Sequence, residues 1–95
     1  MNEQPLQFVT SYEKQLEITK RFISVRKGKK VSQRRLSELS GVSYASIRRF
    51  EKTGDISFSS LVKIAIALRL YDDLDNLFKI EKKYSSIEDA FFYMQ

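Results

Sequence analysis

Apolar residues recur along this chain at intervals of three and four positions, the pattern of amphipathic helices that share one core. The pattern predicts a first helix over residues 12–26, after an N-cap at Thr10 or Ser11. The segment 27–30, a run of lysines around Gly28, should end this helix. The apolar positions of the helix are Tyr12, Leu16, Phe22 and Ile23.

Three further helices are expected, each after a serine placed to cap its first turn, namely Ser32, Ser43 and Ser57. Gly41 should allow the tight turn between the first two of them, because glycine readily adopts a positive φ. The last of the three has a continuous apolar face and is the expected centre of the core. The expected inward side chains are Leu36 and Leu39, then Ile47 and Phe50, then Phe58, Leu61, Ile64, Ala65 and Leu68.

The C-terminal part predicts a fifth helix over residues 72–80, with aspartates in its first turn, and a sixth over residues 87–95. Leu74, Leu77 and Phe78 are the expected inward residues of the fifth. No segment shows sustained alternation of apolar and polar residues, so strands are not expected. We therefore predict an all-α fold, with a flexible N-terminal arm at residues 1–11, a helical domain at residues 12–80 and a C-terminal helical tail at residues 81–95.

The positive charge of the chain is concentrated in one segment. Residues 20–52 hold eleven lysines and arginines against two glutamates, a net charge of +9, whereas the whole chain has +5. Such a segment is the electrostatic footprint of a phosphate-binding surface. A solvated basic face is the simpler alternative, and an anionic membrane surface is a third. The third is disfavoured because the apolar residues of this segment are needed for the core.

Cysteine and histidine are both absent. Their absence excludes disulfides, thiolate zinc sites, cysteine nucleophiles and serine-histidine triads. The chain also lacks a glycine-rich phosphate loop, an apolar run of about 18 residues and the pattern of a signal peptide. We therefore expect a cytoplasmic protein that is not an enzyme and that has no metal, no cofactor and no membrane contact.

Two short helices joined by a turn at Gly41 form the helix-turn-helix arrangement, whose second helix enters the major groove of DNA. The motif is carried by Gln33, Leu36, Ser37, Ser40, Gly41, Val42, Ser43, Ile47, Phe50 and Glu51. With this spacing the chain resembles the phage repressor and Cro-like helix-turn-helix family, also called the XRE family, over residues 12–80. The resemblance implies a lambda-repressor-like bundle of about five helices that binds double-stranded DNA.

The resemblance also assigns structural roles within the motif. Ser37 stands where the family usually has alanine, and its hydroxyl could bond back to its own helix. Glu51 would pair with Arg26 and so tie the first helix to the recognition helix. A solvated Glu51 is the alternative.

The outer face of the helix after Ser43 holds the candidate DNA contacts. By family position Tyr44, Ala45 and Arg49 should face base edges, and Arg49, followed by Arg48, is the expected reader of guanine O6 and N7. Solubility of an exposed face is the alternative explanation for the two arginines. The basic loop at residues 26–30 would add salt-dependent affinity. The predicted DNA-binding residues are Ser32, Gln33, Ser43, Tyr44, Ala45, Ser46, Arg48, Arg49 and Lys52.

One such unit reads only a few base pairs, so the resemblance predicts a homodimer on a palindromic operator. The dimer surface is expected after the fourth helix, where apolar residues and an aromatic tail at residues 91–94 exceed the needs of one helix. Alternatively, the tail folds back on the domain.

Two functions follow from these features. The first is a transcriptional regulator that represses its own operon. The second rests on the stretch RRFEKTGDISFSSLVKIAIAL, residues 48–68, which looks like the HipB-like helix-turn-helix partners of HipA-type kinase toxins. In that case the protein is the antitoxin of a toxin-antitoxin pair, and it binds and restrains a kinase toxin.

Overall fold

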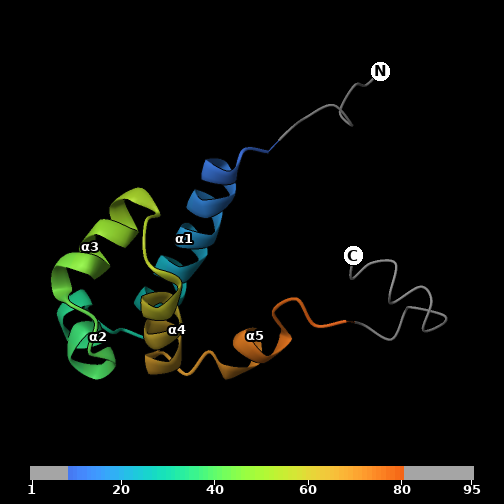
Figure 1. Ribbon diagram of the computed structural model, residues 1–95. Coiled ribbons are helices and arrows are strands. Elements are labelled where there is room, and N and C mark those ends of the chain that lie inside the picture. The colour runs from blue at the N-terminus through green and yellow to red at the C-terminus, as the bar shows by residue number, and fades with distance from the viewer. Residues whose placement is uncertain (1–8, 81–95) are drawn as a thin grey trace, which may run out of the picture.

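The computed structural model describes residues 9–80, and these residues form five α-helices (Figure 1). No residue in this range lies in a strand, so the predicted all-α, lambda-repressor-like bundle is confirmed. The predicted sixth helix, the aromatic tail and the arm before Val9 lie outside the described residues. The helices are α1 (Ser11–Gly28), α2 (Gln33–Ser40), α3 (Tyr44–Thr53), α4 (Phe58–Ala67) and α5 (Tyr71–Asn76).

Side-chain caps define the starts of the first four helices. Thr10 Oγ1 accepts the Glu13 N–H at 3.0 Å, and the Glu13 carboxylate accepts the Thr10 N–H at 3.0 Å, which completes a capping box. Ser32, Ser43 and Ser57 accept the amide hydrogens of Arg35, Ser46 and Ser60 in the same way. Each cap stabilises its helix by about 1 kcal/mol, so short helices that would be marginal alone have defined starts.

α2 lies between α3 and α4 and packs on both, whereas α1 packs on α3, and α5 packs on α4 alone. The rings of Phe22 and Phe50 join α1 to α3 edge to face, with centroids 5.4 Å apart. α4, the expected centre of the core, contributes Ile64 and, at its C-cap, Leu68, and α1, α2 and α3 supply the other helical residues of the core. The buried cluster consists of Phe22, Leu36, Val42, Ile47, Phe50, Ile64 and Leu68.

Four of the residues expected to face inward are exposed instead. Leu39 lies in the last turn of α2 and Phe58 is the first residue of α4, so neighbouring helices do not cover them. α5 ends at Asn76, four residues earlier than predicted, and the backbone at Leu77 is extended. Leu77 and Phe78 consequently leave the helix before they can pack on α4, and Phe78 is 93% exposed.

The turn between α2 and α3 has the predicted glycine at the left-handed position, with a φ of 79° at Gly41. The Ser37 hydroxyl donates a hydrogen bond of 2.7 Å to the carbonyl of Val42. The expectation that Ser37 would bond back to its own helix was wrong, because the turn places the Val42 carbonyl within reach of its hydroxyl. The Ser40 hydroxyl accepts the Val42 N–H at 3.0 Å, so both serines stabilise the turn.

The turn after α3 packs directly on α1. Gly54 has a φ of 81°, and its carbonyl accepts a hydrogen bond of 3.1 Å from Gln15 Nε2. A Cβ atom at Gly54 would lie 3.4 Å from Thr19 Oγ1, in a backbone region that residues with a side chain rarely adopt. Both ends of α3 are therefore fixed by glycine turns. None of the helices within residues 9–80 combines the length and the apolar character needed to cross a bilayer.

Candidate nucleic-acid interface

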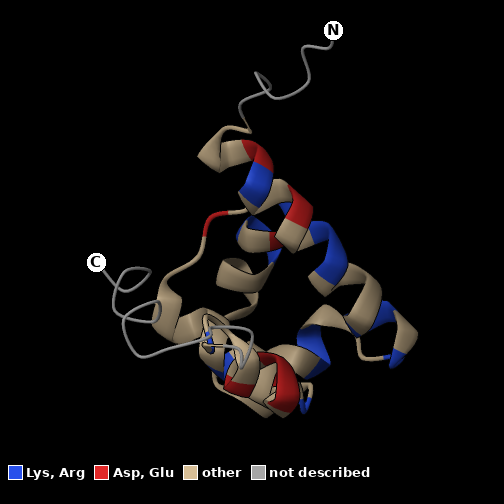
Figure 2. Ribbon diagram, turned by 90° about the vertical axis from the view of Figure 1, so that its right-hand side faces the viewer, with Lys and Arg blue, Asp and Glu red and all other residues tan. Residues whose placement is uncertain are grey.

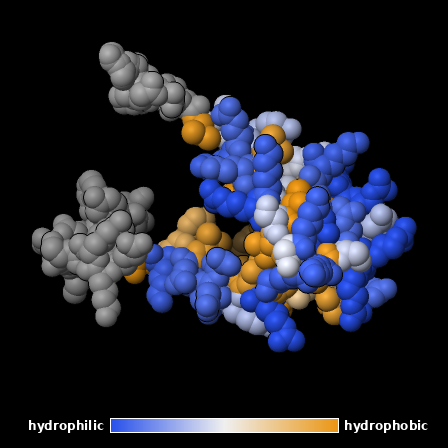
Figure 3. Space-filling view, turned by 180° about the vertical axis from the view of Figure 1, so that it is seen from behind, coloured by the Kyte–Doolittle hydropathy of each residue, from blue (hydrophilic) through white to orange (hydrophobic). Residues whose placement is uncertain are grey.

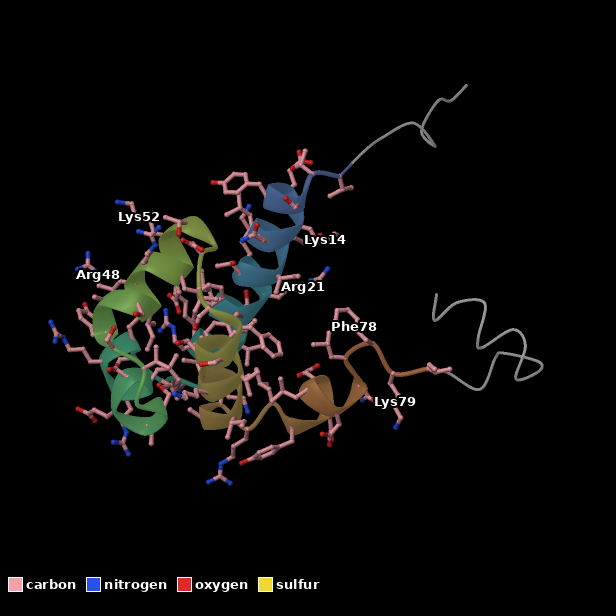
Figure 4. All side chains as sticks on the ribbon, in the orientation of Figure 1. Lys14, Arg21, Arg48, Lys52, Phe78 and Lys79 are labelled. Atoms are coloured by element: carbon pink, nitrogen blue, oxygen red, sulfur yellow. The ribbon has the colours of Figure 1, made fainter. Side chains whose placement is uncertain are left out.

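The outer face of α3 is basic and exposed. Ile47 and Phe50 point into the core, which leaves Arg48, Arg49 and Lys52 on the outside. Figure 4 shows Arg48 and Lys52 projecting from α3 away from α1 and α4, whereas Lys14 and Arg21 lie on the other side of α1. The aspartates of α5 form a separate acidic surface, seen as red segments in Figure 2, where α5 faces the viewer. The basic face of α3 and the aspartates of α5 therefore lie on different parts of the domain.

An open groove of about 800 Å³ runs between the end of α1, the start of α2 and the outer face of α3. The predicted residues that it brings together are Gln33, Ala45, Arg48, Arg49 and Lys52. Arg26 and Lys27 from α1 also line it, so cations from two helices that are far apart in sequence share one concave surface. A surface of this kind concentrates positive potential where a phosphate backbone would lie.

A buried ion pair forms one wall of this groove. Arg26 Nε and Nη2 donate to the two carboxylate oxygens of Glu51 at 2.6 and 2.8 Å, and the two side chains are only 9% and 7% exposed. Arg26 Nη1 donates to the Val31 carbonyl at 2.9 Å, and Gln33 Nε2 donates to Glu51 at 2.8 Å. The pair expected from the family resemblance is confirmed, and a solvated Glu51 is excluded. We call Arg26, Gln33 and Glu51 the α1–α3 junction.

The junction changes the expected position of one site residue. One N–H of the Gln33 amide is engaged by Glu51, so its second N–H and the backbone N–H at the start of α2 remain as donors for a ligand. This N–H has no acceptor within its own helix, as is general for a first-turn amide, and it can meet a phosphate. The predicted DNA contact of Gln33 therefore stays a prediction, and both its side-chain amide and its backbone N–H can donate to a phosphate.

Arg49, the leading candidate for base reading, is itself half of an ion pair. Its Nη2 and Nε donate to Asp55 Oδ2 at 2.8 and 3.2 Å, and the two side chains are 68% and 60% exposed. The sequence placed Asp55 in the turn after α3 and gave it no partner. The turn at Gly54 brings the carboxylate back toward α3, which spacing alone does not reveal.

Tyr44 lies under two guanidinium groups. Arg34 Cζ is 4.2 Å and Arg48 Cζ is 5.6 Å from the centroid of its ring, within the range of cation–π contacts. Arg34 was not among the predicted site residues. It reaches Tyr44 only because the turn folds α2 against α3, so its position in the sequence carried no signal beyond the basic segment.

The three predicted serines form hydrogen bonds at the starts of α2 and α3. The hydroxyls of Ser32 and Ser43 cap α2 and α3, and the Ser43 hydroxyl also donates to Ser46 Oγ at 2.8 Å. Ser32, Ser43, Ala45 and Ser46 are exposed at the surface. The serines lie where the helix N-termini emerge, the position from which amide hydrogens contact phosphates in other proteins.

A family model described as helix-turn-helix matches residues 23–72, which is more than half of the 95 residues and covers the C-terminal part of α1, all of α2, α3 and α4, and the first residues of α5. No curated protein and no solved structure matches the chain.

Proposed function

We propose that this chain, which belongs to the helix-turn-helix family of DNA-binding transcription regulators, represses its own operon by occupying a palindromic operator. The observation that carries the proposal is the exposed basic face of α3, held next to the basic groove by the α1–α3 junction. Occupation of an operator is sufficient to block a promoter, so repression needs only specific and tight binding.

On DNA, α3 would lie in the major groove as the recognition helix. Arg49 would read a guanine through O6 and N7, a contact worth about 1–3 kcal/mol of discrimination. Tyr44, Ala45 and Ser46 would approach neighbouring base edges or sugars. Ser32, Gln33, Ser43, Arg48 and Lys52 would contact phosphates, which fix the register of the helix without reading the sequence.

The α1–α3 junction supports this assignment because it fixes the recognition helix before binding. A helix that is already oriented loses less conformational freedom on binding than a mobile one, so more of the contact energy appears as affinity. Two buried hydrogen bonds from Arg26 and one from Gln33 hold Glu51, which belongs to the inner side of α3.

Homodimerisation is part of the proposal. The exposed apolar residues at the α5 end are Ile66, Tyr71, Leu77, Phe78 and Ile80. In Figure 3 hydrophobic side chains gather around a hollow between the α5 end and the rest of the bundle. α5 lies on the side of α4 away from α3 (Figure 1), so a second copy bound there leaves both recognition helices uncovered. Apolar surface of this kind is typical of interaction sites.

The test of DNA recognition compares a duplex from upstream of the gene with a scrambled duplex of the same composition, at two salt concentrations. Arg49→Ala is expected to reduce the preference for the upstream duplex by about 5- to 100-fold while salt-dependent residual binding remains. Arg21→Ala is the matched control, because Arg21 is equally exposed at 69% but lies on the other side of α1 (Figure 4). A similar loss in both variants would contradict the assignment of α3 as the reading helix.

Repression itself is tested with a reporter gene under the upstream region. Expression of the wild-type chain should lower reporter output, and Arg49→Ala should restore it. Unchanged output with the wild-type chain, despite specific binding in vitro, would exclude repression of its own operon and would leave only DNA recognition.

The second candidate is the antitoxin function, favoured by the 93% exposure of Phe78. In this case the apolar α5 end would be covered by a kinase toxin and not by a second copy. Light scattering of the chain alone and after co-expression with the neighbouring gene product separates the two. A stable stoichiometric complex that Phe78→Ser disrupts would support the antitoxin, whereas a homodimer that Phe78→Ser dissociates would support the repressor alone.

A further inference from the structure

The turn after α3 holds an acidic side chain beside the recognition helix. The Asp55 N–H donates to Thr53 Oγ1 at 3.1 Å, and the Thr53 hydroxyl donates to the Arg49 carbonyl at 2.7 Å. Thr53 thus connects the backbone of Asp55 to that of Arg49. The next residue in this path, Gly54, is fixed by its packing on α1. The Asp55 carboxylate is therefore placed by the backbone of the turn and not only by its attraction to an arginine.

The two hydrogen bonds between Arg49 and Asp55 use one edge of the guanidinium group. Nε and Nη2 both donate to Asp55 Oδ2, at 3.2 and 2.8 Å. Within the described part of the chain, this leaves the other edge, formed by Nη1 and the second N–H of Nη2, for another acceptor pair. O6 and N7 of guanine are such a pair.

We infer that Asp55 is a positioning residue for base recognition, and this inference rests on the proposed function. Asp55 holds the side chain of Arg49 in one orientation, so that the remaining edge of the guanidinium group meets a single guanine. An arginine that is already oriented loses less rotamer freedom on binding, and this favours the correct duplex. The carboxylate also repels phosphates, so an incorrect duplex that does not engage Arg49 gains less from the basic surface.

The test begins with duplexes that the wild-type chain selects from a randomised pool, because selection does not require the operator to be identified first. The probes are the most enriched duplex, the same duplex with single guanines replaced by 7-deazaguanine, and a scrambled duplex. In the wild type, one 7-deazaguanine should weaken binding by about 5-fold or more, since the analogue lacks N7. In Arg49→Ala the same substitution should have no effect.

Asp55→Ala should lower the ratio of affinities for selected and scrambled duplexes by about 2- to 10-fold, the cost of ordering one long side chain on binding. The penalty for the critical 7-deazaguanine should fall in the same variant. Asp55→Asn keeps the size of the side chain and one oxygen acceptor for Arg49, so it should lose less of the ratio than Asp55→Ala, and thermal unfolding of both variants checks that the turn is intact. Affinity for the scrambled duplex should rise, because one negative charge has been removed.

Glu38→Ala is the matched control. Glu38 pairs with the exposed Arg35 at 3.0 Å within the same basic segment, so its removal changes the net charge equally without touching Arg49. This variant should strengthen binding to both duplexes alike and leave their ratio unchanged. If Asp55→Ala and Glu38→Ala change affinity alike and leave the ratio constant, Asp55 contributes only charge and the inference is wrong.

Failure of the inference and failure of the proposed function give different results. If Asp55→Ala keeps the wild-type ratio and the 7-deazaguanine penalty while Arg49→Ala loses both, base reading by Arg49 stands and positioning by Asp55 is refuted. If the wild-type chain enriches no duplex from the pool, sequence-specific binding fails, and the inference fails with it.

Discussion

Two carboxylates near the C-terminal end of α3 meet their arginines in different ways. At the α1–α3 junction, Glu51 receives three hydrogen bonds from Arg26 and Gln33 and is almost fully buried. At the turn after α3, Asp55 receives two hydrogen bonds from Arg49, and both side chains are mostly exposed. The two carboxylates are close in sequence, yet the first pair stabilises the domain and the second remains accessible to a ligand.

The difference shows that the burial of an ion pair, and the number of hydrogen bonds to its carboxylate, decide whether the pair stabilises the fold or remains open to a ligand. A buried pair is costly to break, because the surviving charge is left without solvent. An exposed pair contributes about 0–1 kcal/mol and exchanges partners readily, so it is suited to a surface that must bind something else. On α3, Glu51 is therefore committed to the fold, whereas Arg49 remains accessible to a ligand such as DNA.

The largest expected effect is that of Glu51→Ala. This substitution leaves the Arg26 guanidinium buried without a carboxylate, and we expect it to lower the free energy of unfolding by about 3–5 kcal/mol. Urea denaturation followed by circular dichroism measures the change. A small domain has a total stability of about 5–15 kcal/mol, so partial unfolding at room temperature is an expected result.

The double variant Arg26→Met with Glu51→Leu is the control for this prediction. It replaces both charges by apolar side chains of similar size, and it should recover most of the loss from Glu51→Ala because no charge stays buried. A loss in the double variant as large as in Glu51→Ala would show that the shape of the junction matters more than its charge balance.

Gln33→Met tests the third hydrogen bond of the junction. The amide of Gln33 donates to a charged acceptor, so its removal is expected to lower the free energy of unfolding by about 1.5 kcal/mol, with little change in the volume of the side chain. The same urea titration measures it. No change in stability would mean that solvent replaces Gln33 at the carboxylate and that the junction consists of the ion pair alone.

Much of the fold could be predicted from the sequence, because its determinants are local. The serines that cap α2, α3 and α4 act on amides three residues later, and Gly41 adopts the left-handed conformation that the turn requires. These signals depend on short spacings. The pair of Glu51 with Arg26 was accessible only through the family resemblance, since nothing in their separation of 25 residues predicts contact.

The errors concern residues whose environment depends on distant parts of the chain. Periodicity placed Leu77 and Phe78 inward, but it cannot say whether a partner lies in the same chain, and α5 ends before them. The prediction that Phe58 faces inward was also wrong, because no other helix covers the first residue of α4. At the candidate site, Arg34 and Asp55 were missed because two turns, and not regular spacing, bring them to Tyr44 and Arg49.

Asp55→Ala should change stability far less than Glu51→Ala, although both remove a carboxylate paired with arginine. The expected loss is below about 1 kcal/mol, because the pair is exposed and solvent replaces it. Urea denaturation in low and high salt measures the effect, which should shrink further in high salt. A loss comparable to that of Glu51→Ala would break the distinction between the two pairs and would assign Asp55 a structural role in the turn.

The smallest expected effect concerns Glu17, which extends the comparison to an exposed carboxylate on α1. A hydrogen bond from Lys14 at 2.7 Å and the charge of that lysine, with a further contribution from Arg21, hold the pKa of Glu17 below its ordinary value of 4.5. A carboxyl group whose pKa is lower in the folded state than in the unfolded state adds stability above the unfolded pKa. This stability is lost as the pH falls through the folded pKa. The difference in urea midpoint between the wild type and Glu17→Gln should therefore be greatest near neutral pH, disappear in acid below both pKa values, and shrink in about 1 M salt. A difference that persists unchanged in acid would have to come from packing or helix propensity, and exposed ion pairs on α1 would then add nothing to the stability of the domain.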